Sequence, residues 1–188
     1  MPNSARNSDR LAQARERFVQ AWGQMAGAWG VSRTMAEAHA LLYIVGDPMN
    51  TDEVMDRLQI SRGNASMSLR ALVDWGLVTR VHKRGDRKEY FLAEQDVWAM
   101  LRTIIRERKK RELDPLLVSL HETRDLTASG AGAAAGTDPL IKQHNARLDA
   151  MLEFATVLET LADQASSPGG VDLDDAARAL AEANEERP

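Results

Sequence analysis

Polar and basic side chains gather between Ile60 and Leu92, at spacings that suit contact with a nucleic acid. This stretch holds seven Lys or Arg residues and three acids, although the whole chain of 188 residues carries a net charge of −4. The local charge, rather than the total, decides where a polyanion binds. The pattern therefore predicts a DNA-contacting surface within this stretch.

A helix that is expected to begin after Ser61 carries the groups suited to reading bases. At 100° per residue, its small and polar positions share one face and its apolar positions share the opposite face. Arg70 suits a guanine edge or a phosphate, and Asn64 suits adenine. Gly63 would let free backbone amides approach a phosphate closely. The candidate contact residues of this helix are Ser61, Arg62, Gly63, Asn64, Ser66, Met67 and Arg70.

A second basic group lies at the tip of an expected β-hairpin, in the sequence KRGDRK. The hairpin joins strand-like runs at 77–83 and 89–92, with Gly85 and Asp86 at its turn. Such a tip suits the DNA backbone beside a minor groove, and an arginine can enter a narrow groove. We expect Asp86 to hold a neighbouring arginine in a defined rotamer. The candidate cations of the tip are Lys83, Arg84, Arg87 and Lys88.

Three short helices are expected to position these groups. The first two are predicted at 33–45 and 51–58, and Thr51 is the expected cap of the second. Ser61 is the expected cap of the third helix, and Gly76 ends it. Helix, turn, helix and hairpin in this order predict a winged helix-turn-helix. The expected buried face of the third helix consists of Ala65, Leu69 and Leu72.

The predicted fold is mainly α-helical with a small β-hairpin wing, and helices flank the winged domain. Apolar residues recur at seven-residue spacing in the first helix and again between 141 and 162. Such apolar stripes are expected to be buried, either by a second copy of the chain or by another part of the same chain. Pro115 should break or kink the helix that follows the wing. The expected segments are a flexible leader at 1–8, an N-terminal dimerisation helix at 9–32, a winged helix-turn-helix domain at 33–93, a C-terminal helical dimerisation region at 94–165 with a small-residue linker at 126–138, and an acidic tail at 166–188.

Composition and motifs exclude several classes of protein. The chain has no cysteine, which excludes disulfides and a cysteine nucleophile. No apolar signal region and no membrane-length apolar run is visible, so a cytoplasmic protein is expected. The sequence shows no phosphate-binding loop, nucleophile elbow or metal-ligand cluster. We therefore expect neither an enzyme nor a bound cofactor or metal.

Three segments within 35–125 resemble the MarR superfamily and, more narrowly, its GbsR-like branch. They are ISRGNASMSLRALVDWGLVTRV, KRGDRKEYF and DVWAMLRTIIRERKKRELDPLL. The resemblance implies a homodimeric transcription factor whose interlocked subunits bind a pseudo-palindromic operator. We expect a repressor rather than an activator, because repression needs only that the dimer occupy a promoter, whereas activation needs an additional contact with polymerase. It also implies that residues 61–70 lie at the major groove. Asp86 and Arg87 would then be the acid–arginine pair of the wing.

The resemblance further implies a small-molecule effector that releases the DNA. The GbsR-like branch suggests a quaternary ammonium ligand, which aromatic faces would bind. An aromatic stripe at helical spacing is, alternatively, an ordinary part of the core. The candidate effector residues are Phe18, Trp22, Trp29 and Tyr43.

Two other functions fit the same residues. A winged helix that binds protein would not bind DNA with steep salt dependence. A nonspecific architectural protein would bind all duplexes alike. The basic cluster at 106–111 also has two interpretations, namely an extension of the DNA-facing charge or a solvated helix face.

Overall fold

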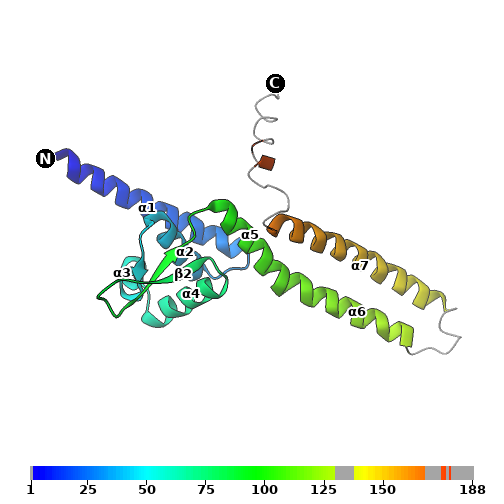
Figure 1. Cartoon of the computed structure of the whole chain (residues 1–188). Coiled ribbons are helices and arrows are strands. Elements are labelled where there is room, and N and C mark those ends of the chain that lie inside the picture. Colours follow the sequence, from blue (N-terminus) through cyan, green and yellow to red (C-terminus); the bar gives the residue numbers. More distant parts are fainter. Residues whose placement is uncertain (1, 130–137, 168–174, 177, 179–188) are drawn as a thin grey trace, which may run out of the picture. The chain divides into compact units, whose positions relative to one another are not determined.

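The structure is a computed structural model, and it describes all residues except 1, 130–137, 168–174, 177 and 179–188. The chain divides into an N-terminal unit at 1–100 and a C-terminal unit at 101–188. Among the described residues, every helix is too short or too polar to span a lipid bilayer. The elements in chain order are α1 Pro2–Ala28, α2 Arg33–Val45, β1 Met49–Asn50, α3 Thr51–Leu58, α4 Arg62–Asp74, β2 Val78–His82, β3 Glu89–Ala93, α5 Val97–Arg108, a π-helical turn η1 Lys109–Leu113, α6 Asp114–Ser129 and α7 Pro139–Ser166 (Figure 1).

The core of the N-terminal unit lies between α2, α3, α4 and the sheet. Ala65, Leu69 and Leu72 are at most 1% exposed, which confirms the predicted inward face of α4. Leu42 on α2 and Val54 on α3 are also fully buried, and both of these helices contact α4. Burial of these apolar groups fixes the direction of α4 and turns its polar face outward.

The first helix differs from its prediction at its start. α1 begins at Pro2 rather than near Asp9, so the described part of the expected flexible leader is helical. Val19 and Ala26 are buried, and α1 packs on α2, so the same chain covers one side of the helix. Leu11 remains 53% exposed on another side.

The caps of α3 and α4 explain where the two helices begin. Asn50, rather than the expected Thr51, caps α3. The Asn50 side chain accepts a hydrogen bond from Glu53 N at 3.1 Å, and the Glu53 carboxylate accepts one from Asn50 N at 2.7 Å. This reciprocal pair is a capping box. Ser61 caps α4 as expected, because its hydroxyl accepts a hydrogen bond from Asn64 N at 3.3 Å.

The wing is part of a three-stranded antiparallel sheet with the order β1–β3–β2. The hairpin of β2 and β3 was predicted, but the two-residue strand β1 was not. Tyr90 lies opposite Val81 on β2 and opposite Asn50 on β1. At the tip, Asp86 N donates a hydrogen bond to Lys83 O at 3.1 Å, and Gly85 has a φ of +85°. The fold is therefore mainly helical with a small sheet, as predicted.

Pro115 does not end the helix in the way the sequence suggested. It is the second residue of α6, directly after the π-helical turn η1. Asp114 N donates to Lys109 O, which is the wider hydrogen bond of a π-helix. Because proline lacks an N–H and crowds the preceding turn, local widening lets the chain continue as a helix.

The C-terminal unit contains the antiparallel pair formed by α6 and α7, whose contact buries Ala155. Residues 126–129 of the expected linker are helical, and 130–137 lie outside the described residues. Asp138 instead caps α7, and its side chain accepts a hydrogen bond from Leu140 N at 2.8 Å. Most of the expected acidic tail also lies outside the described residues.

Candidate nucleic-acid interface

The outward face of α4 presents the residues selected from the sequence. Arg62, Gly63, Asn64, Met67 and Arg70 are exposed, and Met67 reaches 68% exposure. Ser66 is half-buried, and Ser61 is occupied as the cap. A large apolar side chain so exposed is available to a partner surface. The helix thus divides into an apolar face and a polar face, which a recognition helix requires.

Gly63 is not required by the packing of the protein itself. A Cβ atom added there would meet Ser61 Oγ at 3.9 Å, which is an ordinary contact. The residue is helical and has no left-handed backbone angle. Its missing side chain therefore leaves room on the outer surface, at the helix end where backbone amides attract anions.

The cations of the wing fall into two groups. Arg84 and Arg87 are exposed and, like Arg70, form no ion pair with another described residue. Lys83 is engaged instead: its Nζ lies 3.9 Å from the centroid of the Tyr90 ring and donates to Pro48 O at 3.3 Å. Two arginines at the tip are thus available to phosphate without breaking an internal ion pair.

Asp86 organises the backbone of the wing rather than an arginine side chain. Its carboxylate accepts hydrogen bonds from Lys88 N at 2.9 Å and from Tyr90 Oη at 2.7 Å. These bonds hold the pKa of Asp86 below its usual value, and the bond to Asp86 raises the pKa of Tyr90. Asp86 was expected to pair with an arginine. Its carboxylate instead accepts a hydrogen bond from the hydroxyl group of Tyr90 on β3.

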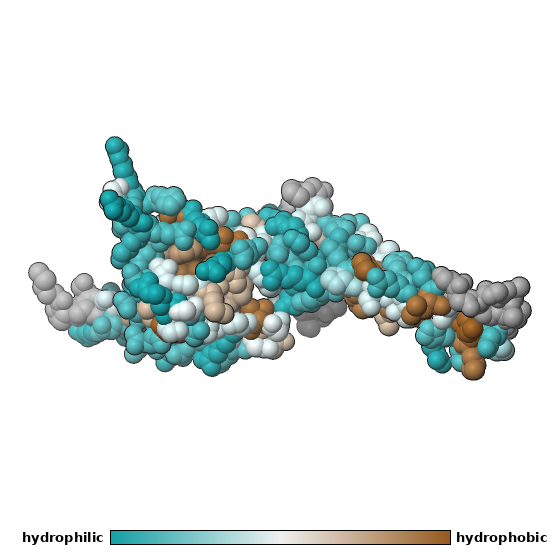
Figure 2. Space-filling view, turned by 90° about the horizontal axis from the view of Figure 1, so that it is seen from below, coloured by the Kyte–Doolittle hydropathy of each residue, from teal (hydrophilic) through white to brown (hydrophobic). Residues whose placement is uncertain are grey.

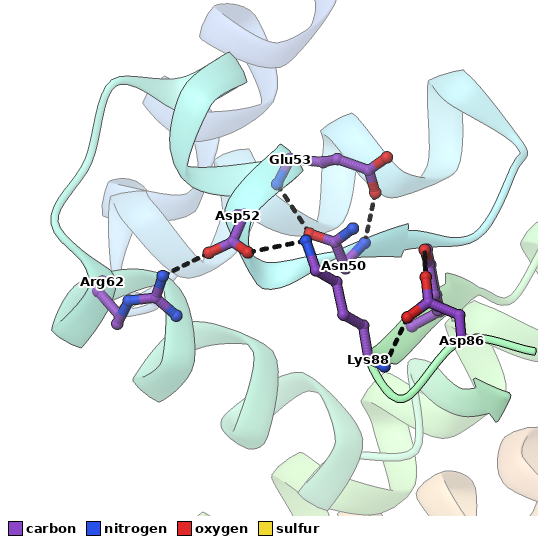
Figure 3. Close-up of polar contacts among 7 residues, drawn as sticks. Asn50, Asp52, Glu53, Arg62, Asp86 and Lys88 are labelled. Carbon is purple, nitrogen blue, oxygen red and sulfur yellow. Dashed lines mark hydrogen bonds and ion pairs between the residues drawn. The ribbon is translucent and has the colours of Figure 1, made fainter. Parts of the chain in front are cut away.

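Asp52, in the first turn of α3, is not among the site residues predicted from the sequence. Its carboxylate accepts hydrogen bonds from Arg62, the first residue of α4, and from Lys88 Nζ at 3.2 Å (Figure 3). The bonds from Lys88 and Arg62 hold the pKa of Asp52 below its usual value. One carboxylate therefore contacts both α4 and the wing, which lie too far apart in sequence for any local signal to pair them.

The basic cluster at 106–111 is largely engaged within the C-terminal unit. Lys109 Nζ lies 2.8 Å from Asp163 and 3.4 Å from Glu159, both on α7. Arg108 pairs with Glu112 at 3.2 Å. Lys109 thus joins the η1 turn to α7, whereas Arg106, Lys110 and Arg111 are exposed, which fits the interpretation as a solvated helix face.

An aromatic cavity of about 220 Å³ lies within the N-terminal unit. Three of the four candidate effector residues line it, but Trp29 does not, and it is 53% exposed. His39 also lines the cavity, and its Nε2 has no hydrogen-bond partner among the described residues. Burial lowers the pKa of His39 to about 4, so the ring is neutral at pH 7. The lining residues are Phe18, Trp22, His39, Ala40, Tyr43, Val97 and Met100.

Comparison with known proteins agrees with this geometry. Residues 29–89 match the model of the MarR family. The chain is 25% identical over 114 residues to the HTH-type transcriptional repressor GbsR of Bacillus subtilis (strain 168), covering 61% of this chain and 63% of that protein. It is 23% identical over 94 residues to the putative HTH-type transcriptional regulator YvaV of the same organism, covering 50% and 53% respectively. The matches thus span less than two thirds of either relative.

A solved structure described as a transcriptional regulator shares the fold. It superposes with a TM-score of 0.54 at 23% identity and covers 81% of this chain and 95% of that one. The relatives are regulators rather than enzymes, in agreement with the lack of enzyme motifs in the sequence.

Proposed function

We propose that this chain, a member of the MarR superfamily through residues 29–89, is a sequence-specific DNA-binding transcriptional regulator. The observation that carries the proposal is the contact of Asp52 with both Arg62 on α4 and Lys88 on the wing. This contact makes the recognition helix and the wing parts of one surface. Arg70, Arg84 and Arg87 add to that surface cations that form no ion pair with other described residues.

The two elements have different tasks on DNA. α4 enters a major groove, where Arg70 reaches a guanine edge and Asn64 reaches an adenine. Arg84 and Arg87 contact the backbone or the minor groove beside it. Base contacts from α4 specify the site, whereas phosphate contacts from the wing set the position of the protein.

The exposed seam of α7 supports a homodimer. Met151, Phe154, Leu158 and Leu161 recur at alternating spacings of three and four residues, and each is at least 39% exposed. This is the spacing of a coiled-coil seam. Ala155, beside this seam, is buried, and α7 packs against α6. Figure 2 shows hydrophobic patches along this helical pair. A second copy of the chain is the proposed cover, since two recognition helices then meet two half-sites.

Repression is the proposed direction of regulation. A dimer that occupies a promoter excludes polymerase without any further contact, whereas activation needs a polymerase-binding surface. The relative GbsR is itself named a repressor. Occupancy of a pseudo-palindromic operator is therefore sufficient for the proposed action.

The first experiment is a titration of the full chain against fluorescent duplex DNA from upstream of its own gene. Random duplex of the same length is the control, and both are measured at two salt concentrations. We expect tight, salt-sensitive binding that prefers the upstream duplex. Equal binding to both duplexes would support a nonspecific architectural protein. No binding at low salt would support a protein-interaction module.

A small-molecule effector is the second component of the proposal, and the aromatic cavity favours it. Phe18, Trp22 and Tyr43 offer ring faces to a cation such as choline. His39 Nε2 offers a hydrogen-bonding atom to the hydroxyl group. Choline should then quench tryptophan fluorescence and raise the melting temperature. Absence of both effects at millimolar choline would restrict these rings to a packing role.

A further inference from the structure

Asp52 places a negative charge on the surface that is otherwise rich in cations. The residue lies in the first turn of α3, and its side chain is 41% exposed. One carboxylate oxygen accepts from Arg62, which is 68% exposed, and the other accepts from Lys88 Nζ at 3.2 Å, which is 55% exposed. In Figure 3, Asp52 lies between these two cations. The site is therefore open to a phosphate from outside.

The contact divides the cations of the surface into occupied and available groups. Arg62 and Lys88 both pair with the single carboxylate of Asp52 in the free protein, whereas Arg70, Arg84 and Arg87 form no ion pair with other described residues. Ion pairs this exposed add little to stability. The contribution of these two ion pairs to the stability of the fold is therefore expected to be small.

We propose that Asp52 is a specificity-determining residue that suppresses binding to DNA in general. The inference rests on the proposed DNA-binding function and deepens it. Nonspecific affinity grows with the number of phosphates that the protein neutralises. Specific affinity depends also on base contacts held in register. Asp52 withholds Arg62 and Lys88 from phosphate and fixes the wing against the start of α4, so it lowers nonspecific affinity more than specific affinity.

The test replaces Asp52 by Asn in the full chain. One probe is a duplex that the wild-type protein selects from a random pool, and the other is unselected random duplex. Asp52→Asn should raise the affinity for random duplex roughly tenfold near 0.1 M salt, as one additional phosphate contact implies. The salt dependence should steepen by about one to two phosphate contacts. The ratio of specific to nonspecific affinity should fall.

Asp56→Asn is the matched control. Asp56 is an exposed acid on the same helix and forms no ion pair with another described residue. The substitution makes the same change in charge as Asp52→Asn, but it releases no paired cation. It should therefore leave the ratio of specific to nonspecific affinity near the wild-type value. If Asp52→Asn keeps the wild-type ratio, or shifts it no more than Asp56→Asn does, the inference is overturned while the proposed function stands. If the wild-type protein selects no sequence, both fail together.

A double-mutant cycle with Arg62 distinguishes the proposed coupling from a general change in charge. Arg62→Gln should lower the affinity for random duplex less while Asp52 is present than after Asp52→Asn, because Asp52 pairs with this cation only in the first case. In the Asp52→Asn background, the same substitution should remove a large part of the gain. Additive effects of the two substitutions would overturn the proposed withholding of Arg62 by Asp52. Thermal melting of each variant checks that the folds are retained.

Discussion

Arg70 and Arg87 carry the same charge but meet DNA from different elements. Arg70 is exposed on α4, and the buried residues on the opposite face of that helix fix its direction. Arg87 lies at the tip of the wing, where Asp86 shapes the turn through its bond to Lys88 N. A side chain on a packed helix can read a base edge, whereas one on an exposed tip suits the repetitive phosphate backbone.

Substitution of these two arginines should therefore have different effects. Arg70→Ala should cost about 1–3 kcal/mol on the specific duplex and less on random duplex. Arg87→Ala should weaken both by similar amounts. Fluorescence anisotropy on both duplexes measures the effects, with Arg17→Ala on α1 as a control for lost charge. Equal losses on both duplexes for both variants would contradict the division of tasks.

A substitution at Gly63 can distinguish an effect on the stability of the protein from an effect on DNA binding. Gly63→Ala should leave the free energy of unfolding unchanged or raise it by up to about 1 kcal/mol, because alanine favours helix and the added Cβ meets no clash. DNA affinity should nevertheless fall, since the Cβ fills space needed by the backbone of the DNA. Denaturant unfolding and duplex titration test the two halves. Undiminished DNA binding by the folded variant would show that α4 does not approach the DNA at this residue.

Protonation of His39, which lines the aromatic cavity, should make the free energy of unfolding depend on pH. Its pKa is about 4 in the folded protein and 6.5 when exposed, so the unfolded chain binds the proton more readily between these values. The full stability is present above pH 6.5, and about 3 kcal/mol is lost as the pH falls to about 4. His39→Leu should remove this loss, whereas His82→Leu on β2 should retain it. Urea unfolding across this range measures the difference, and parallel pH curves for the wild type and His39→Leu would refute it.

At the scale of elements, the sequence located α2, α3, α4 and the hairpin because each has strong local signals. Gly46 and Gly76 have positive φ after α2 and α4, where the sequence favours helix ends. The cap of α3 was misassigned by one residue. Asn50 is suited to the task because pairing with β3 holds its backbone extended. That pairing spans forty residues of sequence, as its register shows, and local reading cannot supply it.

The capping box of α3 gives a prediction at this scale. Asn50→Ala should lower the free energy of unfolding by about 1 kcal/mol, because the backbone amide of Glu53 loses the side-chain oxygen that accepts its hydrogen bond. Thr51→Ala is the control, since Thr51 is the cap that the sequence alone suggested. Chemical denaturation of both variants gives the comparison. A larger loss for Thr51→Ala than for Asn50→Ala would be inconsistent with the observed cap.

At the scale of the whole molecule, the proposed homodimer rests on the exposed apolar seam of α7. Apolar groups that stay exposed at coiled-coil spacing are typical of a surface covered by another chain. Phe154 is 58% exposed and Leu161 is 55% exposed, although the helix is long and well packed on α6 by its other face. The C-terminal unit thus retains an apolar surface that its own described residues do not bury.

Phe154→Glu should dissociate the proposed dimer without unfolding the chain. Loss of two buried phenylalanines, at about 1.5–3 kcal/mol each, weakens a symmetric dimer by roughly 100-fold or more. Gln164→Glu adds the same charge to an exposed polar position of α7 and serves as the control. Light scattering after size exclusion gives the mass, and circular dichroism verifies helicity. A Phe154→Glu variant with unchanged mass would place any dimer interface elsewhere.

The sequence by itself determined the mainly helical class, the order of helices and hairpin, and the polar face of α4. These features follow from periodicity, caps and turn residues within a few positions of each other. Only the tertiary structure placed Asp52 against Arg62 and Lys88, folded Tyr90 back to Asp86, and excluded Trp29 from the cavity. It also placed a π-helical turn directly before Pro115, where the sequence predicted a break or kink of the helix. These features depend on contacts between packed elements, or on the relief of strain within the fold. Local sequence patterns do not specify such contacts or such strain.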